Sequence, residues 1–581
     1  MTGLAWRAGN ARWWWLLALG ILVLALAAGA TSWHNGFAYD DVYLIAKSAR
    51  MHTLAGWWRE FAHTYWPEDS GGDGYRPLTI LAFRLEYAIG AGKPLVFHAV
   101  NIALHAATSV AVFWLATALL PLGAGWIAGA LYAVHPVHVE AVANIVGQSE
   151  LWVALLTTLS MALFVHARRA GPLNVRHWVG IGVLYAIALL FKEHAIVLPA
   201  LLIAAEAIVV PDRAPLNARL LRMRLPLLVL TVVALGYLWA RSVVVIGGFS
   251  GFQPYIVFQA LNLSAANRIL TMVGAAPEWL RLFLWPARLM TEYAPPYIDI
   301  AQGPSVSQLP GLLVLLGILG LMLACWRRSP VTSFGIAWLV ITLLPASNFV
   351  VPAGFIIAER TLLLPSVGVM LALGSAVPWL YERLESRRIA QYGAACALGV
   401  ILALGIWRSS TRNPVWKDNE TLFRQAIKDS PESYRAHFML GVLLFERLRK
   451  TEGDNEYREA FRLFPYDPLM SLALAEQYRK AGMCDAAITL YRWLYTIEPD
   501  AQSGHTGFAT CLLVTLKLDE ARTEALRAIR SGGDVPAARA IIRAATAARD
   551  SLAVRHMAAD TATAIVPASS ATHSPLPPSS R

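Results

Sequence analysis

Eleven apolar runs, each near the length that crosses a bilayer, constrain this 581-residue chain more than any other feature. They lie at about 13–31, 95–118, 124–136, 147–166, 177–191, 195–210, 225–247, 310–326, 331–349, 361–380 and 389–408. Hydrophobic residues make up 56% of the chain and charged residues only 15%, which is more apolar surface than a soluble fold can bury. The sequence therefore predicts an all-α, polytopic membrane bundle of about eleven spans.

The charges between these runs predict how the bundle is oriented. Two further stretches, Leu78–Ile89 and Ile269–Leu289, are apolar but carry charged residues, and we place both in the outer interface as amphipathic helices. This assignment gathers the arginines of the short loops on one side, as the positive-inside rule requires. These arginines are Arg7, Arg12, Arg168, Arg169, Arg176, Arg213, Arg219, Arg222, Arg224, Arg327, Arg328, Arg383, Arg387 and Arg388. The N-terminus is then cytoplasmic, and two large outer loops span 32–94 and 248–309.

The positive charge of the chain does not indicate a nucleic-acid partner. The net charge of +11 comes from small basic clusters between apolar runs, which is typical of cytoplasmic loops. The first apolar run is long and has no small-residue cleavage site behind a short core, so we expect a retained membrane anchor.

The C-terminal part of the chain repeats with a period of 34 residues. Pro431, Pro465 and Pro499 are spaced by this period, and so are two sets of small residues. Small residues where two helices cross, with a proline closing the second helix, are typical of tetratricopeptide repeats. Such repeats stack into an α-solenoid that binds peptides or proteins, so this part predicts a protein or peptide partner.

The change of composition after Arg408 separates these two parts. Cys484 and Cys511 lie in the repeat part and could pair if it lies outside the cytosol. The expected domains are a membrane domain over 1–410, a linker with a first helix over 411–433, repeats with a helical cap over 434–552, and a disordered tail over 553–581.

Two adjacent carboxylates begin the first outer loop. Asp40 and Asp41 follow the first apolar run closely. Such a pair would raise the pKa of each carboxyl or hold a cation together, and an Asp pair that caps the following helix is an equally good interpretation.

Ionisable residues also gather at three other outer connections, where they are costly and usually functional. His135, His138 and Glu140 share one connection, where a metal, a phosphate, a sugar or simple polar packing would suit them. The other candidates are Glu150, Lys192, Glu193, Glu359 and Arg360. Lysine and arginine at span ends either fasten the bundle through ion pairs or bind the phosphate of a lipid.

At these positions the sequence resembles the transmembrane and tetratricopeptide repeat-containing O-mannosyltransferases of the GT-C superfamily. The excess of Arg over Lys and the abundance of Ala favour a bacterial member. The stretches that carry the resemblance are Phe37–Asp41, Tyr75–Leu78, Phe97–His105, His135–Val142, Gly147–Leu151, Phe191–Glu193, Glu359–Ser366 and Trp416–Asp418.

The resemblance implies an enzyme that moves a mannose-like hexose from a polyprenyl-phosphate carrier to protein Ser or Thr hydroxyls on the periplasmic or lumenal side. Asp40 maps onto the general base, with Asp41 beside it. Arg360, Lys192 and Arg76 are the candidates for the lipid phosphate, and the remaining outer residues are candidates for substrate contact. A divalent cation, Mg or Mn, is a further candidate, with Asp40, Asp41, His135 and His138 as possible ligands. We expect the inner membrane of a bacterium, with periplasmic repeats, or the endoplasmic reticulum membrane in a eukaryote.

Two positions depart from the family pattern. Gln148 stands where the family often has Arg, and Thr361 stands where an aromatic residue is usual. Two other functions remain open at this point. A membrane-anchored scaffold would need no polar cluster among the spans, and a transporter of lipid-linked sugar would need ionisable residues near mid-membrane.

Overall fold

The computed structural model describes residues 11–67, 73–245, 255–384 and 387–564. Arg7, parts of both predicted outer loops and the chain after Ala564 lie outside these residues. The described chain consists of helices joined by turns and loops, with no β-strand among the residues described, so the all-α prediction is confirmed. It divides into two compact units, residues 1–464 and 465–581.

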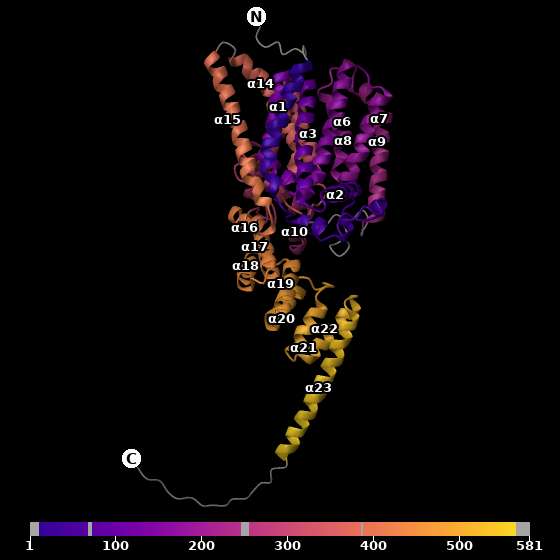
Figure 1. The fold of residues 1–581 in the computed structure, drawn as a ribbon, viewed down its shortest axis with the longest axis vertical. Helices are drawn as coiled ribbons and strands as arrows, with labels where there is room; N and C mark the ends of the chain where they lie inside the picture. The colour runs from indigo at the N-terminus through magenta and orange to yellow at the C-terminus, as the bar shows by residue number, and fades with distance from the viewer. Residues whose placement is uncertain (1–10, 68–72, 246–254, 385–386, 565–581) are drawn as a thin grey trace, which may run out of the picture. The chain divides into compact units, whose positions relative to one another are not determined.

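All eleven predicted apolar runs are helices of the first unit, and their long members run side by side in Figure 1. They are α1 (Ala11–Gly29), α3 (Pro94–Leu119), α4 (Leu122–Val134), α6 (Gln148–Ala170), α7 (Val175–Phe191), α8 (Leu198–Ile208), α9 (Leu216–Val244), α12 (Leu309–Arg328), α13 (Pro330–Leu343), α14 (Leu363–Leu384) and α15 (Arg388–Arg412). By length and composition, 7 helices of the described chain could cross a membrane: those formed by α1, α3, α6, α9, α12, α14 and α15. The other four are shorter, so eleven crossings remain a prediction.

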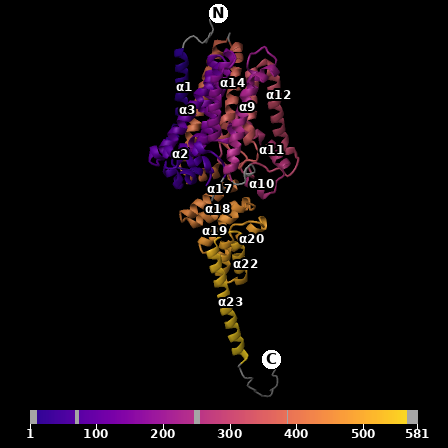
Figure 2. The same cartoon turned by 90° about the vertical axis from the view of Figure 1, so that its right-hand side faces the viewer.

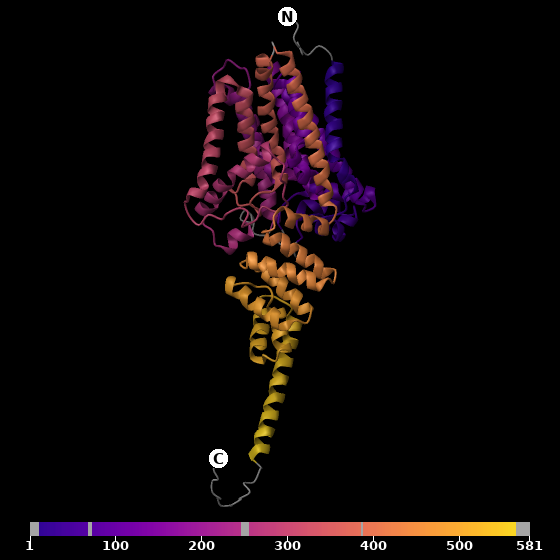
Figure 3. The same cartoon turned by 90° about the vertical axis from the view of Figure 1, so that its left-hand side faces the viewer.

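Close packing of small residues joins the membrane helices, as expected where lipid gives no hydrophobic force between them. A Cβ added to Gly335 of α13 would overlap the carbonyl oxygen of Gly368 in α14. Ile21 and Ala25 of α1 share a buried cluster with Leu402 of α15, and Figure 3 shows these two helices next to each other.

The two amphipathic stretches form α2 (Pro77–Gly90) and α11 (Ala265–Leu284), and neither is among the candidate spans. Figure 2 shows them with α10 (Ile256–Ala260) at one end of the membrane helices. The charges of α2 are buried against protein: Arg84 pairs with Glu60 and donates to the carbonyls of Thr53 and Ala55, both at 2.7 Å. On α11, Arg281 pairs with Glu278 at 2.6 Å.

The C-terminal part consists of α16 (Asn419–Asp429) and three helical hairpins, followed by α23 (Val535–Ala564). The hairpins are α17 (Tyr434–Glu446) with α18 (Lys450–Leu463), α19 (Pro468–Lys480) with α20 (Cys484–Ile497), and α21 (His505–Val514) with α22 (Leu518–Arg530). Their small residues lie where paired helices cross, since a Cβ on Gly441 would lie 2.7 Å from the ring of Tyr457. The predicted tail began at 553, whereas α23 continues to Ala564.

The boundary between the two units differs from the expected domain boundary after 410. The first hairpin belongs to the membrane unit, because its apolar face has partners there. Leu440 of α17 and Phe423 of α16 share one buried cluster with Ala38 of the first predicted outer loop and Val139 of α5 (Val139–Ala143). In the second unit, Cys484 and Cys511 form a disulfide between α20 and α21, so the pairing that the sequence left open is present.

Candidate active site

The two adjacent carboxylates of the first outer loop have different environments. Asp41 is buried and accepts hydrogen bonds from the backbone N–H groups of Ala38 at 3.3 Å, Ile145 at 3.3 Å and Val146 at 2.9 Å. Burial raises the pKa of Asp41 to about 8, although these N–H groups oppose the shift. Asp41 therefore ties the first outer loop to the start of α6.

Asp40 has a carboxylate that is left available. It makes no hydrogen bond and no ion pair with any residue that the structure describes, although it is partly buried. Burial raises the pKa of Asp40 to about 6, against the opposing field of the Arg360 guanidinium. A carboxylate with this pKa accepts a proton more readily than an ordinary aspartate does.

Tyr39 holds Asp40 in place through an unusual backbone conformation. Its φ of 55° lies in the left-handed region, which is unfavourable for a residue with a Cβ. Its N–H donates to Oδ1 of Asn419 at 2.6 Å, and its hydroxyl donates to Oε1 of Glu292 at 3.1 Å. Arg435 of α17 pairs with Glu292, with Nε 3.4 Å from Oε2. The orientation of Asp40 thus depends on α16, on the second outer loop and on the first repeat.

Sequence reasoning missed Tyr39, Asn419, Glu292 and Arg435. Asn419 directly follows the Trp416–Asp418 stretch that leads into the repeats, which is a weak signal for this position. No local pattern singles out Glu292 or Arg435, because their roles depend on contacts between distant parts of the chain.

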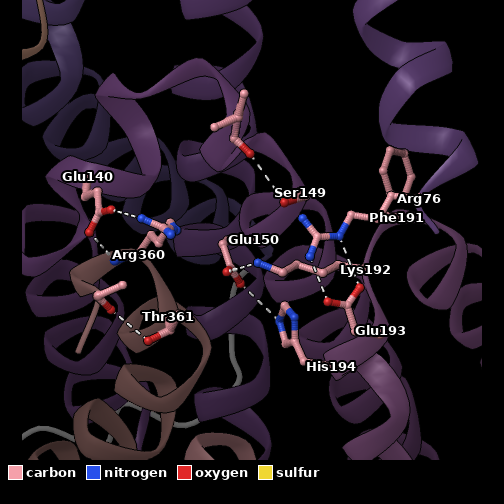
Figure 4. Close-up of polar contacts among 12 residues, drawn as sticks. Arg76, Glu140, Ser149, Glu150, Phe191, Lys192, Glu193, His194, Arg360 and Thr361 are labelled. Atoms are coloured by element: carbon pink, nitrogen blue, oxygen red, sulfur yellow. Dashed lines mark hydrogen bonds and ion pairs between the residues drawn. The ribbon is translucent and has the colours of Figure 1, made fainter. Parts of the chain in front are cut away.

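Three partly buried ion pairs lie next to one another on the predicted outer side of the bundle, and Figure 4 shows them in a row. We call them the outer ion-pair row: Arg360 with Glu140, Lys192 with Glu150, and Arg76 with Glu193. Each cation keeps some exposure, with side-chain values of 23% for Arg360, 14% for Lys192 and 17% for Arg76. The structure thus brings together all three predicted phosphate-binding cations.

The Arg360 end of the row lies nearest to Asp40, since Asp40 interacts electrostatically with both Arg360 and Glu140. The backbone N–H of Arg360 donates to Oε2 of Glu140 at 2.9 Å, and its guanidinium bonds to the other carboxylate oxygen. A carboxylate held at both oxygens fixes the direction of the guanidinium, which has further N–H groups to donate.

The other two pairs extend the row. His194 joins Lys192 on Glu150, with its Nε2 3.2 Å from Oε2 of that carboxylate. Burial lowers the pKa of Lys192, while Glu150 opposes the shift. Arg76 donates to both oxygens of Glu193, at 3.1 Å and 2.7 Å.

Three predicted site residues are not members of the row and fasten the bundle. Both ring nitrogens of His135 form hydrogen bonds: Nε2 bonds to the carbonyl of Phe283 at 3.0 Å, and Nδ1 accepts from the N–H of Val137 at 3.3 Å. His138 is buried and bonds to the Ser366 hydroxyl at 2.8 Å. Glu359 is also buried and accepts hydrogen bonds from the N–H of Met290 at 2.7 Å and the hydroxyl of Tyr293 at 2.6 Å.

The chain resembles several known proteins. No protein-family model matches it. It is 28% identical over 501 residues to Protein O-mannosyl-transferase TMTC4 of Mus musculus, covering 77% of this chain and 66% of that protein. It is 29% identical over 532 residues to Protein O-mannosyl-transferase Tmtc1 of Drosophila melanogaster, covering 75% of this chain and 60% of that protein. The chain is thus similar to these O-mannosyl-transferases over about three quarters of its length. The match with Protein O-mannosyl-transferase TMTC3 of Mus musculus, at 26% identity, covers 76% of this chain and 50% of that protein. The matched part thus spans less than two thirds of these relatives.

Both departures from the family pattern have partners in the structure. Gln148 is buried and its amide nitrogen donates to Oε2 of Glu86 and Oδ1 of Asn101, both at 3.1 Å. Burial raises the pKa of Glu86 to about 8. The hydroxyl of Thr361 donates to the carbonyl of Ala358 at 2.7 Å and so supports the turn that carries Arg360.

The possible metal ligands do not fit a metal site built by this chain alone. Within the described ranges, no three His, Cys, Asp or Glu side chains are grouped so that they could hold an ion. Of the four candidates, Asp41 already accepts backbone hydrogen bonds, and His135 and His138 bond to other protein groups.

An apolar cavity of about 500 Å³ lies between α8, α11, α12 and α13. Ile208, Trp279 and Leu315 are among its lining residues. Ser347 and Phe349, in the loop that follows α13, also line it. This loop leads toward the outer ion-pair row: Asn348 donates to the carbonyl of Phe355 at 2.8 Å, and the Phe355 ring lies 5.5 Å from the Arg360 guanidinium.

Proposed function

We propose that this protein transfers a mannose-like hexose from a polyprenyl-phosphate carrier to a Ser or Thr hydroxyl of an acceptor protein. The observation that carries the proposal is the unpaired carboxylate of Asp40 beside the Arg360 end of the outer ion-pair row. Protein O-mannosyl-transferase is also the name of the relatives at 28% and 29% identity.

The proposed reaction divides its work between Asp40 and the cations. Asp40 accepts the proton of the acceptor hydroxyl while the hydroxyl oxygen forms a bond to the anomeric carbon of the sugar. The bond between that carbon and the phosphate oxygen breaks, and the oxygen leaves with the electron pair. Arg360, Lys192 and Arg76 stabilise the resulting charge on the polyprenyl phosphate.

Asp40 must point at the hydroxyl for this step, and its neighbours supply the orientation. Tyr39, held by Asn419 and by Glu292, fixes the backbone that carries Asp40. Asp41 fixes the backbone on the C-terminal side of Asp40 through the hydrogen bonds that it accepts from three backbone N–H groups. We therefore assign proton transfer to Asp40 and positioning to Asp41, Tyr39 and Asn419.

The donor's lipid chain requires an apolar site that reaches the row. The cavity between α8, α11, α12 and α13 suits an isoprenoid chain, because its lining is almost entirely apolar. The loop from Ser347 to Arg360 connects this cavity with the proposed phosphate site. A scaffold function would require neither the cavity nor an unpaired carboxylate.

The reaction is proposed to take place outside the cytosol, at the inner membrane of a bacterium. The distribution of arginines supports this orientation. The disulfide between Cys484 and Cys511 supports it independently, since disulfides persist in oxidising compartments.

The experiment is release of polyprenyl phosphate by the purified full chain from a polyprenyl-phosphate mannose, with a Ser/Thr-containing peptide as acceptor. Arg360→Gln should reduce release about 10²–10³-fold, as expected when one charge-stabilising donor is removed. Arg281→Gln is the matched control, because Arg281 belongs to an outer ion pair that is not part of the row. Equal losses in the two variants, or no release by the unmodified protein, would contradict the proposal.

A further inference from the structure

The outer ion-pair row lies near the start of α6, and a second charged site lies near the end of this helix. Glu150 stands near the start of this helix and Arg168 near its end, so about 27 Å separates them at 1.5 Å per residue. This distance is close to the thickness of the hydrocarbon core of a bilayer. A pocket of about 420 Å³ is lined there by residues from the ends of α6, α7 and α9 and from the connections between helices. We call it the arginine pocket, after Arg168, Arg169, Arg213, Arg219 and Arg222.

Two of the five arginines build the wall of this pocket. Arg168 donates to Oε1 of Glu206 at 2.8 Å and to Oδ2 of Asp212 at 2.6 Å. Arg219 donates to the same Glu206 oxygen at 2.9 Å and to the carbonyl of Val210 at 3.3 Å. Glu206 is completely buried. The wall is therefore a fixed frame of paired charges.

The other three arginines leave the pocket with excess positive charge. The side chains of Arg169 and Arg213 make no ion pair or hydrogen bond with any described part of the chain. Arg222 lies 4.0 Å from Asp212 and is 69% exposed. The five arginines are balanced by only two carboxylates, Asp212 in the lining and Glu206 behind it, so the pocket carries excess positive charge. Three guanidinium groups with free N–H donors around one hollow suit a phosphate.

Part of the pocket lining is apolar, and we call this part the floor; it narrows the class of ligand. Leu173, Trp178 and Met223 line it. Trp178 lies with its ring 6.0 Å from that of Phe164, and Trp side chains prefer the depth of lipid head groups. A ligand that joins a phosphate to an apolar body would satisfy both the arginines and this floor.

We propose that the arginine pocket binds the phosphate head group of an anionic phospholipid of the cytoplasmic leaflet. This site is distinct from the proposed donor site, because the two lie at opposite ends of α6. Segregation of positive charge to the cytoplasmic side explains why arginines occur on this face, but it does not require three of them to line one pocket with an apolar floor.

The test is native mass spectrometry of the full chain with phosphatidylglycerol and phosphatidylcholine of identical acyl chains. The wild-type protein should retain phosphatidylglycerol preferentially. Changing Arg169, Arg213 and Arg222 together to Gln should weaken this retention about 100-fold, since each arginine near an anionic surface contributes about fivefold. Arg213→Gln alone, in an exposed connection, should weaken the retention of phosphatidylglycerol about fivefold. This single variant keeps the test valid if the triple variant misfolds.

The matched control changes Arg327, Arg328 and Arg388 to Gln. These arginines are exposed at the end of α12 and the start of α15, and none of them lines the arginine pocket, so the control loses the same charge without touching it. It should retain phosphatidylglycerol as the wild type does, and an equal loss in the control would overturn the proposal. Inorganic phosphate and glycerol phosphate should not displace the lipid at similar concentrations. Displacement by either one would assign the pocket to a soluble phosphate and would also overturn it.

Discussion

The tether between Asn419 and Tyr39 makes a quantitative prediction about catalysis. Asn419→Ala removes the acceptor of the Tyr39 N–H, a hydrogen bond of 2.6 Å, from a residue held at φ 55°. An N–H left without its partner costs about 1–3 kcal/mol, and the left-handed backbone becomes harder to hold. A cost of about 1.4 kcal/mol corresponds to a tenfold change in rate. If Asp40 acts only in the tethered orientation, the rate of transfer at saturating donor should therefore fall about 5–150-fold.

The assay measures release of polyprenyl phosphate under saturating donor, so that kcat is separated from binding. Asn419→Asp keeps an oxygen at the accepting position and should stay within a few-fold of the wild type. Asp418→Ala is the matched control, because Asp418 caps α16 through the Thr421 N–H at 2.9 Å without touching Tyr39. It should lower stability by about 0.5–2 kcal/mol and leave kcat unchanged. If Asp418→Ala slows the reaction as much as Asn419→Ala does, the tether argument is refuted.

Three further predictions concern pH, the disulfide and the repeats. Because burial raises the pKa of Asp40 to about 6, kcat/KM should fall about tenfold per pH unit below that value as the base becomes protonated, and a flat profile down to pH 4 would exclude this base. Replacing Cys484 and Cys511 with Ser should cost the second unit about 3–4 kcal/mol, from the separation of 27 residues along the chain, as measured by its thermal or denaturant unfolding; a difference below 1 kcal/mol would contradict it. Removing residues 465–581 should leave transfer to a small acceptor intact, whereas removing the chain from 434 onward should abolish it. The second truncation also removes Arg435, which pairs with Glu292 near Asp40; similar activity in both truncated proteins would contradict the role of the first repeat.

The helices of this protein could be predicted because their signals are local. Each apolar run from 13–31 to 389–408 became a helix, since backbone groups in lipid must be satisfied within the segment. The hairpins followed from a period of 34 and from small residues such as Gly441. The sequence could not predict that the first hairpin packs with the membrane unit. This packing depends on a buried cluster that the hairpin shares with distant parts of the chain.

The site residues could be predicted by type but not by role. Glu140 and Arg360 stood out as charges at outer connections, yet their pairing joins positions 220 residues apart. His138 looked like a ligand in sequence, but the chain supplies Ser366 as its partner. Asp40 and Asp41 are adjacent and of the same type, and only the fold shows that backbone N–H groups occupy Asp41.

The central claim is that Asp40 is the catalytic base and that Asp41 positions it. Its most direct test compares polyprenyl-phosphate release by Asp40→Asn and Asp41→Asn in the full-length protein, with folding checked by thermal unfolding. Asp40→Asn should lose about 10²–10⁴-fold in kcat with an unchanged Tm, because an amide cannot accept the proton. Asp41→Asn should lower Tm and reduce kcat much less, since its amide would set an N–H donor against backbone N–H groups. A folded Asp40→Asn protein as active as the wild type would contradict the assignment, and so would equal losses of kcat in the two variants.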